Sequence, residues 1–154
     1  MAQTAATALS LRDWPDGIAL CARWNFEQWG RDLGRDLPGT EEALRDIATG
    51  TAGQDAVIGF LDGKPAGMAL LIDCDLESHA HLKPWVASVY TVPEARGKGV
   101  ATAMMLKLED MAWHYGFEAA YLYTGIPDFY AQLGWTVIGL VQKNTPMSVM
   151  KRAL

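Results

Sequence analysis

Apolar residues along the chain follow two patterns, continuous short runs and longer stretches with helical spacing. The run 85–92 is almost entirely apolar and rich in β-branched and aromatic residues, which is typical of a strand buried on both faces. From residue 100 the apolar positions recur three or four residues apart, at Val100, Met104, Leu108, Met111 and Tyr115. This spacing predicts an amphipathic helix. A turn over 93–99, with two glycines, joins the strand to the helix.

The same reading of the whole chain predicts elements in the order β, α, α, β, β, β, α, β, α, β, β. The other strands are predicted over 7–12, 55–61, 64–72, 119–124, 135–141 and 147–150. The other helices are predicted from about 14 to 30, from 40 to 49 and over 129–133. We find no repeat or linker and expect one domain, 1–154. Strands alternating with helices in this way indicate an α/β fold, a mixed sheet with helices on both faces.

The segment 73–84, just before the central strand, leaves two interpretations open. Its titratable residues all stand at odd positions, Asp73, Asp75, Glu77, His79 and His81. If the segment is extended, all five project from one face, because side chains alternate along a strand. The alternative is a solvated loop or strand face, since exposed rows of charged residues are common.

Composition and charge narrow the classes of partner. The chain has 154 residues, with 13 Lys and Arg against 18 Asp and Glu, a net charge of −5. This acidity argues against a nucleic acid or an anionic membrane as partner, because both need a broad basic surface. We see no signal peptide and no apolar window long enough to span a membrane. Cys21 and Cys74 form no CxxC pattern, so we interpret them as reduced thiols and expect a cytoplasmic protein.

The turn between the central strand and the long helix is a candidate anion site. The first N–H groups of a helix have no internal partner, and the helix dipole favours negative charge there. Glycines allow a phosphate to approach the backbone, and Arg96 and Lys98 add positive charge. Two other phosphate motifs do not fit, because the Walker pattern is absent and Thr102 stands where a Rossmann motif needs its last glycine.

Three segments together resemble the GNAT superfamily of acetyl-CoA-dependent N-acetyltransferases. Arg96-Gly-Lys-Gly99-Val-Ala101 is similar to the family's pyrophosphate loop, which follows a strand. Phe129-Tyr130-Ala-Gln-Leu133-Gly134-Trp135 is similar to its Phe-Tyr-x-x-x-Gly-Phe/Trp segment. Val149-Met150-Lys151-Arg-Ala-Leu154 is a common family ending. The element order agrees over almost the whole chain, and the resemblance is least informative over 13–50 and 73–84.

The resemblance implies a mostly antiparallel central sheet of about six to seven strands and direct attack of an amine on the acetyl thioester. Acetyl-CoA would be the co-substrate. Tyr130 would be the general acid that protonates the departing thiolate. A backbone N–H near Val89 or Tyr90 would stabilise the oxyanion. The residues implied to bind acetyl-CoA are Val89, Tyr90, Thr91, Arg96, Gly97, Lys98, Gly99, Val100, Ala101 and Thr102.

The group that deprotonates the amine is not fixed by the resemblance. We favour Asp75 and Glu77 as candidate bases, acting directly or through water, with His79 next. A zinc site that includes His79 and His81 is an alternative, although the family needs no metal and we expect none. Nothing places a base beside Cys74, so an acyl-cysteine is not favoured.

The acceptor is predicted to be a small-molecule primary amine. Its pocket should lie among the first two helices, 73–84 and the last hairpin. We interpret Trp24 and Trp29 as packing residues and Glu27 as an exposed helix carboxylate. Alternatives are a non-catalytic acyl-CoA-binding or regulatory module, a protein N-terminal or lysine acetyltransferase, and an interaction scaffold. We expect a monomer or a homodimer.

Overall fold

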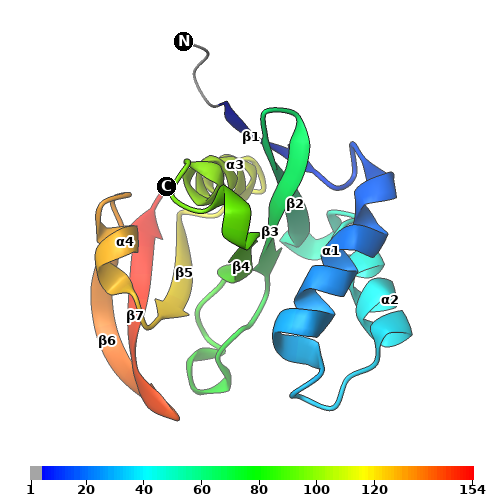
Figure 1. Cartoon of the computed structure of the whole chain (residues 1–154). Helices are drawn as coiled ribbons and strands as arrows, with labels where there is room; N and C mark the ends of the chain where they lie inside the picture. Colours follow the sequence, from blue (N-terminus) through cyan, green and yellow to red (C-terminus); the bar gives the residue numbers. More distant parts are fainter. Residues whose placement is uncertain (1–4) are drawn as a thin grey trace.

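A computed structural model describes residues 5–154, and its centre is one seven-stranded sheet (Figure 1). The strand order is β1-β2-β3-β4-β5-β7-β6. Every neighbouring pair is antiparallel except β4 and β5, so the predicted fold class, a mixed and mostly antiparallel sheet, is confirmed. The strands are β1 (Ala6–Ser10), β2 (Asp55–Leu61), β3 (Lys64–Ile72), β4 (Trp85–Thr91), β5 (Ala119–Thr124), β6 (Thr136–Lys143) and β7 (Thr145–Ala153).

The parallel pair at the centre of the sheet is open. Within the described residues, β4 and β5 are in register only at Trp85 and Tyr121. Trp85 is the first residue of β4, so the rest of this strand leaves β5 and its backbone groups have no ladder partner on that side. The opening exposes the edge of β4 in the middle of the molecule.

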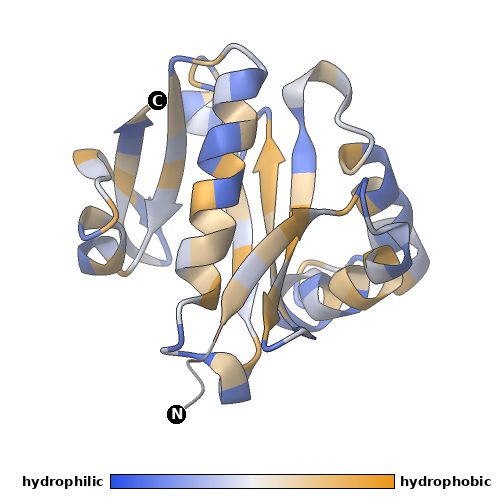
Figure 2. Ribbon diagram, turned by 90° about the horizontal axis from the view of Figure 1, so that it is seen from above, coloured by the Kyte–Doolittle hydropathy of each residue, from blue (hydrophilic) through white to orange (hydrophobic). Residues whose placement is uncertain are grey.

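Helices cover both faces of the sheet, as predicted. Figures 1 and 2 show α3 (Val100–His114) lying across one face, with α1 (Ile18–Asn25) and α2 (Leu37–Ile47) on the other. Alternate strand residues feed two cores: Val57 and Val86 pack on the α3 side, whereas Ile58 and Ala87 pack on the α1–α2 side. In Figure 2 the central strands are mostly hydrophobic in colour. Over residues 5–154, no helix is long and apolar enough to cross a membrane.

Several predicted boundaries are met, and α2 shows why others are not. β2, β3 and β5 and the start of α3 agree with the sequence prediction. α2 begins three residues before the predicted Thr40, because Asp36 caps it by accepting a hydrogen bond from the Gly39 N–H at 2.7 Å. The Thr40 hydroxyl instead donates to the Asp36 carbonyl at 2.8 Å, within the helix.

The first predicted helix is three segments. A 3₁₀ turn (Pro15–Gly17) leads into α1, and the last turn widens to a π-helix (Phe26–Gly30). Single π turns occur frequently at functional sites. β1 covers 6–10 and the short helix α4 (Pro127–Ala131) lies two residues earlier than predicted. The closing strands β6 and β7 are longer than predicted.

The segment 73–84 is not extended, so of the two interpretations left open, the structure agrees with a loop and not with five titratable residues on one strand face. It bends through a 3₁₀ turn at Glu77–His79. Two leucines hold it to the sheet: Leu76 is buried, and Leu82 packs against the same cluster around Trp85. The Trp85 indole N–H also donates to the Leu82 carbonyl at 2.7 Å. Burial of Leu76 and partial burial of Leu82 stabilise the bent segment against the sheet.

Candidate active site

A β-bulge interrupts β4 where it leaves β5. The register with β3 shifts between Met68 and Leu70, and Ser88 opposite them has a φ of 53°. A serine rarely adopts this left-handed conformation, so neighbouring contacts must hold it. Asn25 at the end of α1 supplies one, because its side-chain amide donates to the Ser88 hydroxyl at 3.0 Å. The bulge marks the boundary between two cavities.

The first cavity, which we call the β4–α3 cavity, has a volume of about 580 Å³. It contains nine of the ten residues predicted to bind the acyl donor; Lys98 is exposed and lies outside it. Its lining is Gln28, Trp29, Val89, Tyr90, Thr91, Ala95, Arg96, Gly97, Gly99, Val100, Ala101, Thr102, Ile126, Phe129 and Tyr130.

The glycine-rich turn gives this cavity an anion-binding end. Gly97 and Gly99 have φ values of 73° and 90°, which glycine adopts without a steric cost. Gly99 is the N-cap of α3, and no side chain among the described residues caps this helix. Its first N–H groups therefore remain available to a ligand. Arg96 is bent back, its Nε donating to the Thr91 carbonyl at 3.1 Å, and so ties the turn to the end of β4.

Tyr130 also lines this cavity. It is 7% exposed and packs edge-on against Phe129 and Trp135, with ring centroids 4.9 and 6.5 Å away. Burial raises the pKa of Tyr130 to about 12. The hydroxyl therefore stays protonated at neutral pH and can donate a hydrogen bond to a group in the cavity.

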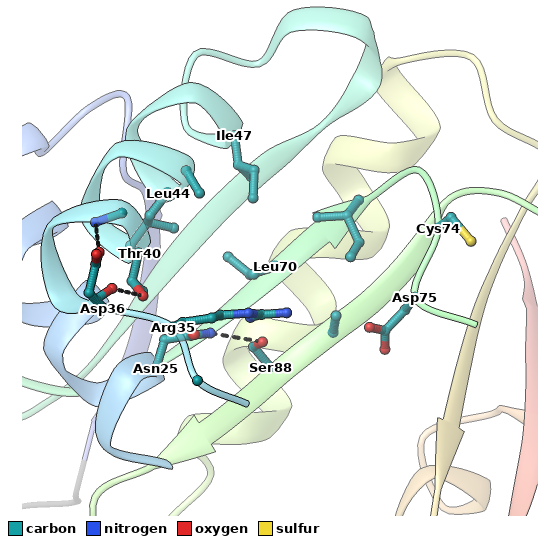
Figure 3. Close-up of a pocket in the computed structure, with 15 residues that line it drawn as sticks. Asn25, Arg35, Asp36, Thr40, Leu44, Ile47, Leu70, Cys74, Asp75 and Ser88 are labelled. Carbon is teal, nitrogen blue, oxygen red and sulfur yellow. Dashed lines mark hydrogen bonds between the residues drawn. The ribbon is translucent and has the colours of Figure 1, made fainter. Parts of the chain in front are cut away.

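The second cavity, which we call the α2–β3 cavity, has a volume of about 590 Å³ and lies on the other side of the bulge (Figure 3). Helices α1 and α2, strand β3, and the loop after it supply its walls. Its lining is Asn25, Gly34, Arg35, Asp36, Gly39, Thr40, Ala43, Leu44, Ile47, Leu70, Ile72, Cys74, Asp75, Ala87 and Ser88.

Of the two carboxylates predicted as bases, only Asp75 lies in a cavity. Burial raises the pKa of Asp75 to about 6, although Lys143 and Arg35 act against this shift. A carboxyl with this pKa is mostly ionised at neutral pH and accepts a proton more readily than an ordinary aspartate. Glu77 is exposed, stands on the 3₁₀ turn and lines neither cavity.

Sequence reasoning missed several residues that line the cavities. Gln28 and Trp29 line the β4–α3 cavity from the π turn. No local sequence motif predicts that the helix widens there. Trp24, by contrast, packs on Tyr90 with ring centroids 5.9 Å apart, as its interpretation as a packing residue suggests. Asn25 and Arg35 carried no sequence signal, because only the tertiary fold brings them to the second cavity.

The two histidines proposed as an alternative metal site lie close together. The rings of His79 and His81 stack with centroids 6.1 Å apart. Over residues 5–154, the structure contains no group of three or more His, Cys, Asp or Glu side chains placed to hold a metal ion. A zinc site in this loop therefore lacks a third protein ligand.

A central strand that leaves its parallel neighbour, a bulge, and a glycine-rich turn at a helix N-terminus define an α/β protein with a candidate anion site beside β4. The sequence profile of the Acetyltransferase (GNAT) family matches residues 10–135. The chain belongs to this family.

Solved structures share the fold at low sequence identity. An aminoglycoside 6'-N-acetyltransferase complexed with coenzyme A is 13% identical with a TM-score of 0.72, over 97% of this chain and 96% of that one. A GNAT-family acetyltransferase from Streptococcus pneumoniae is 14% identical with a TM-score of 0.69, over 99% of each chain. YncA from Salmonella typhimurium, described as an acetyltransferase and solved with its cofactor acetyl-CoA, is 15% identical with a TM-score of 0.72, over 99% and 95%. No curated protein matches the chain in sequence.

Proposed function

We propose that this chain, acting as a single domain, transfers the acetyl group of acetyl-CoA to the primary amine of a small molecule. The observation that carries the proposal is the placement of two cavities on either side of the Ser88 bulge. One has an anion-binding helix end and a protonated tyrosine. The other has a carboxyl whose pKa of about 6 suits a general base.

Acetyl-CoA fits the β4–α3 cavity by its chemistry. The N–H groups of Gly97 to Thr102 and the dipole of α3 would hold the pyrophosphate. The pantetheine arm contains amides, and the free edge of β4 over Val89–Thr91 offers backbone groups to pair with them. The structures of the aminoglycoside 6'-N-acetyltransferase and of YncA, which contain coenzyme A and acetyl-CoA, support this choice of ligand.

The acceptor amine would enter by the α2–β3 cavity. An alkylammonium must lose a proton before its nitrogen lone pair can attack, and Asp75 would accept that proton, directly or through water. The new bond forms between the amine nitrogen and the thioester carbonyl carbon. A backbone N–H at the bulge, near Val89 or Tyr90, would stabilise the negative charge that develops on the carbonyl oxygen.

Collapse of this tetrahedral species breaks the carbon–sulfur bond and releases the CoA thiolate. The Tyr130 hydroxyl would donate its hydrogen bond, and finally its proton, to the sulfur. The nitrogen loses its second proton to solvent as the amide forms. The products are the N-acetylated amine and CoA, and the tyrosine recovers its proton from water. No metal takes part in this scheme.

The α2–β3 cavity favours a small acceptor. Leu44, Ile47 and Leu70 form apolar walls, and a volume of about 590 Å³ suits a metabolite-sized ligand. A regulatory module that only binds acyl-CoA would have no use for a second cavity with a raised-pKa carboxyl.

A thiol-release assay tests the proposal. Acetyl-CoA is incubated with the protein and a panel of primary amines, and free CoA thiol is measured against time. We expect amine-dependent release for at least one member of the panel. If CoA raises the melting temperature but no amine gives release, the chain binds the donor without transferring the acetyl group.

A further inference from the structure

The α2–β3 cavity contains a positive charge that the proposed reaction does not use. Arg35 lies in the connection between α1 and α2, and its backbone N–H donates to the Gly30 carbonyl at 2.9 Å. Figure 3 shows its side chain extended along the cavity in the direction of Asp75. Among residues 5–154, no carboxylate lies within ion-pair distance of Arg35.

The other charges around the cavity make this arginine stand out. Asp36 is occupied as the N-cap of α2. The positive charges of Lys143 and Arg35 both act on the Asp75 carboxylate and lower its pKa against the effect of burial. An anion on the ligand would pair with Arg35, whose planar fork of donors matches a carboxylate in two parallel hydrogen bonds.

The walls that α2 and β3 give the cavity are mostly apolar. Ala43, Leu44 and Ile47 line it from α2, and Leu70 and Ile72 line it from β3, whereas Asn25, Thr40 and Ser88 add polar groups elsewhere in the lining. A ligand that packs against these two walls therefore needs an apolar body between its charged groups. The amine belongs near Asp75 and the bulge, where the acetyl group would arrive.

We propose that the acceptor is an amino acid or a similar apolar amine that carries a carboxylate, and that Arg35 selects it by binding this carboxylate. The proposal rests on the proposed function, because it names the acceptor of that reaction. It makes Arg35 a substrate-binding residue and separates its role from that of Asp75.

The same charges disfavour a polycationic acceptor. An aminoglycoside carries several ammonium groups, and each needs a nearby carboxylate to offset its lost hydration. The lining of the α2–β3 cavity has two carboxylates, Asp75 and Asp36, of which Asp36 also caps α2, and Arg35 adds a positive charge beside them. Two carboxylates are too few for the several ammonium groups of an aminoglycoside, so we expect no turnover of an aminoglycoside despite the shared fold with an aminoglycoside 6'-N-acetyltransferase.

The test compares leucine with two analogues that lack the carboxylate, and with a polycationic aminoglycoside. Thiol release from acetyl-CoA is measured with L-leucine, L-leucinamide, 3-methylbutylamine and kanamycin, for the wild type and for Arg35→Ala, Arg35→Lys and Arg23→Ala. Arg23 is the matched control, because it is an exposed arginine on α1 that lines neither cavity.

We expect leucine to have the highest kcat/KM in the wild type. Arg35→Ala should lower it by about tenfold to a hundredfold, as for a hydrogen-bonded charge, and leave leucinamide within about threefold. Arg35→Lys should recover part of the loss, and Arg23→Ala should change neither acceptor.

Four results would overturn the inference. Turnover of leucinamide, 3-methylbutylamine or kanamycin equal to or above that of leucine would reject the acceptor class while the proposed function stands. A preference for leucine that survives in Arg35→Ala would remove Arg35 as its cause. Absence of thiol release with these four acceptors, when another amine of the panel gives release, would likewise reject the acceptor class alone. Absence of release over the whole panel, while CoA still binds, would reject the proposed function and this inference with it.

Discussion

The side-chain amide of Asn25 donates a hydrogen bond to the hydroxyl of Ser88 across 3.0 Å. Asn25 is the last residue of α1 and 8% exposed, and Ser88 is the bulged residue of β4 with a φ of 53°. The bond thus connects α1, which lines the α2–β3 cavity, to β4, which lines both cavities. It holds the bulge next to Val89, near which we propose the backbone N–H that stabilises the oxyanion.

Removing this bond should slow the reaction more than it weakens donor binding. Asn25→Ala is expected to lower kcat about tenfold, since a small misplacement of reacting groups is costly, and to lower the free energy of unfolding by about 0.5–1.5 kcal/mol. Steady-state kinetics and urea unfolding measure the two effects. Ser88→Ala removes the same bond from the other side, so the double variant should be no slower than either single one; additive losses would contradict a shared role.

Tyr130→Phe should separate catalysis from binding. The ring keeps its packing against Phe129 and Trp135, and only the hydroxyl is lost. We expect kcat to fall about 10²–10⁴-fold, as for a general acid, with the Kd of CoA within about threefold. Tyr121→Phe, at the start of the open pair, is the control and should retain activity. An unchanged kcat for Tyr130→Phe would remove this residue from the mechanism.

Gly97→Ala tests the anion site without creating a clash. An added Cβ would meet no atom within 4 Å, but a φ of 73° strains alanine by about 1 kcal/mol or more and should tilt the turn. We expect CoA to bind at least about tenfold more weakly by calorimetry, because several N–H groups must align on one ligand. Gly63→Ala is the matched control.

Gly63 has a φ of 82° in the β2–β3 hairpin, its Cβ would also meet nothing within 4 Å, and it lines neither cavity. Its substitution should cost similar stability and leave CoA affinity unchanged. Equal CoA affinity in the two variants would place the pyrophosphate away from the Gly97 turn.

Asp75→Asn should lower activity and raise the free energy of unfolding, and the gain in stability should depend on pH. Burial raises the pKa of Asp75 to about 6 from its ordinary value of 3.8. Between pH 3.8 and pH 6, Asp75 is therefore protonated in the folded state and ionised in the unfolded state. The buried charge therefore destabilises the wild type fully above pH 6, and this penalty disappears as pH falls below 3.8. The free energy of unfolding of Asp75→Asn should exceed that of the wild type by about 1–3 kcal/mol at pH 8. At pH 3.5 the two free energies should be equal.

The kinetics of the same variant test the assignment of Asp75 as base. The wild-type kcat/KM should rise with pH through about 6, where Asp75 ionises. Asp75→Asn should have a lower kcat/KM that does not rise with pH around 6. Glu77→Gln should keep the wild-type pH profile, because Glu77 lines neither cavity. If Glu77→Gln alters the pH profile of kcat/KM and Asp75→Asn does not, Glu77 and not Asp75 is the general base.

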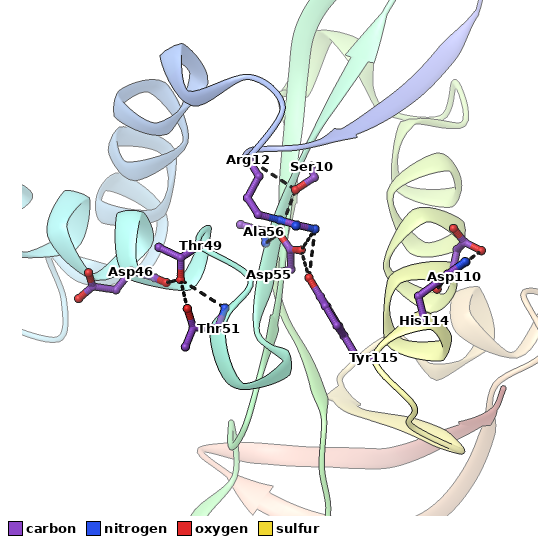
Figure 4. Close-up of polar contacts among 10 residues, drawn as sticks. All are labelled: Ser10, Arg12, Asp46, Thr49, Thr51, Asp55, Ala56, Asp110, His114 and Tyr115. Atoms are coloured by element: carbon purple, nitrogen blue, oxygen red, sulfur yellow. Dashed lines mark hydrogen bonds and ion pairs between the residues drawn. The ribbon is translucent and has the colours of Figure 1, made fainter.

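A fully buried carboxylate elsewhere in the sheet should matter for stability alone. Figure 4 shows Asp55 at the start of β2 receiving hydrogen bonds from Ser10 (3.0 Å), Arg12 (2.8 Å) and the Tyr115 hydroxyl. Burial, with the adjacent Asp55 carboxylate, raises the pKa of Tyr115 to about 12. Tyr115→Phe should lower the free energy of unfolding by about 1–3 kcal/mol. CoA affinity should not change, and a loss of affinity would show that this network supports the cavities.

The sequence predicts the core elements well and the acceptor side poorly, for physical reasons. Strand β4, the turn and α3 are marked by local signals, an apolar run, two glycines and a helical period. Tyr130 is predicted from the resemblance of Phe129–Trp135 to a family motif. In the bent loop 73–84, Leu76 is buried and Leu82 is partly buried in the cluster around Trp85, and local alternation in the sequence does not reveal this tertiary contact. Arg35 and Asn25 line the α2–β3 cavity only because α1 and α2 pack on the sheet, which is also a tertiary contact.

A crystal structure with acetyl-CoA would show which cavity binds the donor. We expect pyrophosphate density at the N–H groups of Gly97 to Thr102, the pantetheine arm along Val89–Thr91, and the thioester between the Ser88 bulge and Tyr130. The α2–β3 cavity should stay open to an amine on the other side of the bulge. Pyrophosphate or pantetheine density in the α2–β3 cavity, or no bound ligand at a saturating concentration, would contradict this placement of acetyl-CoA.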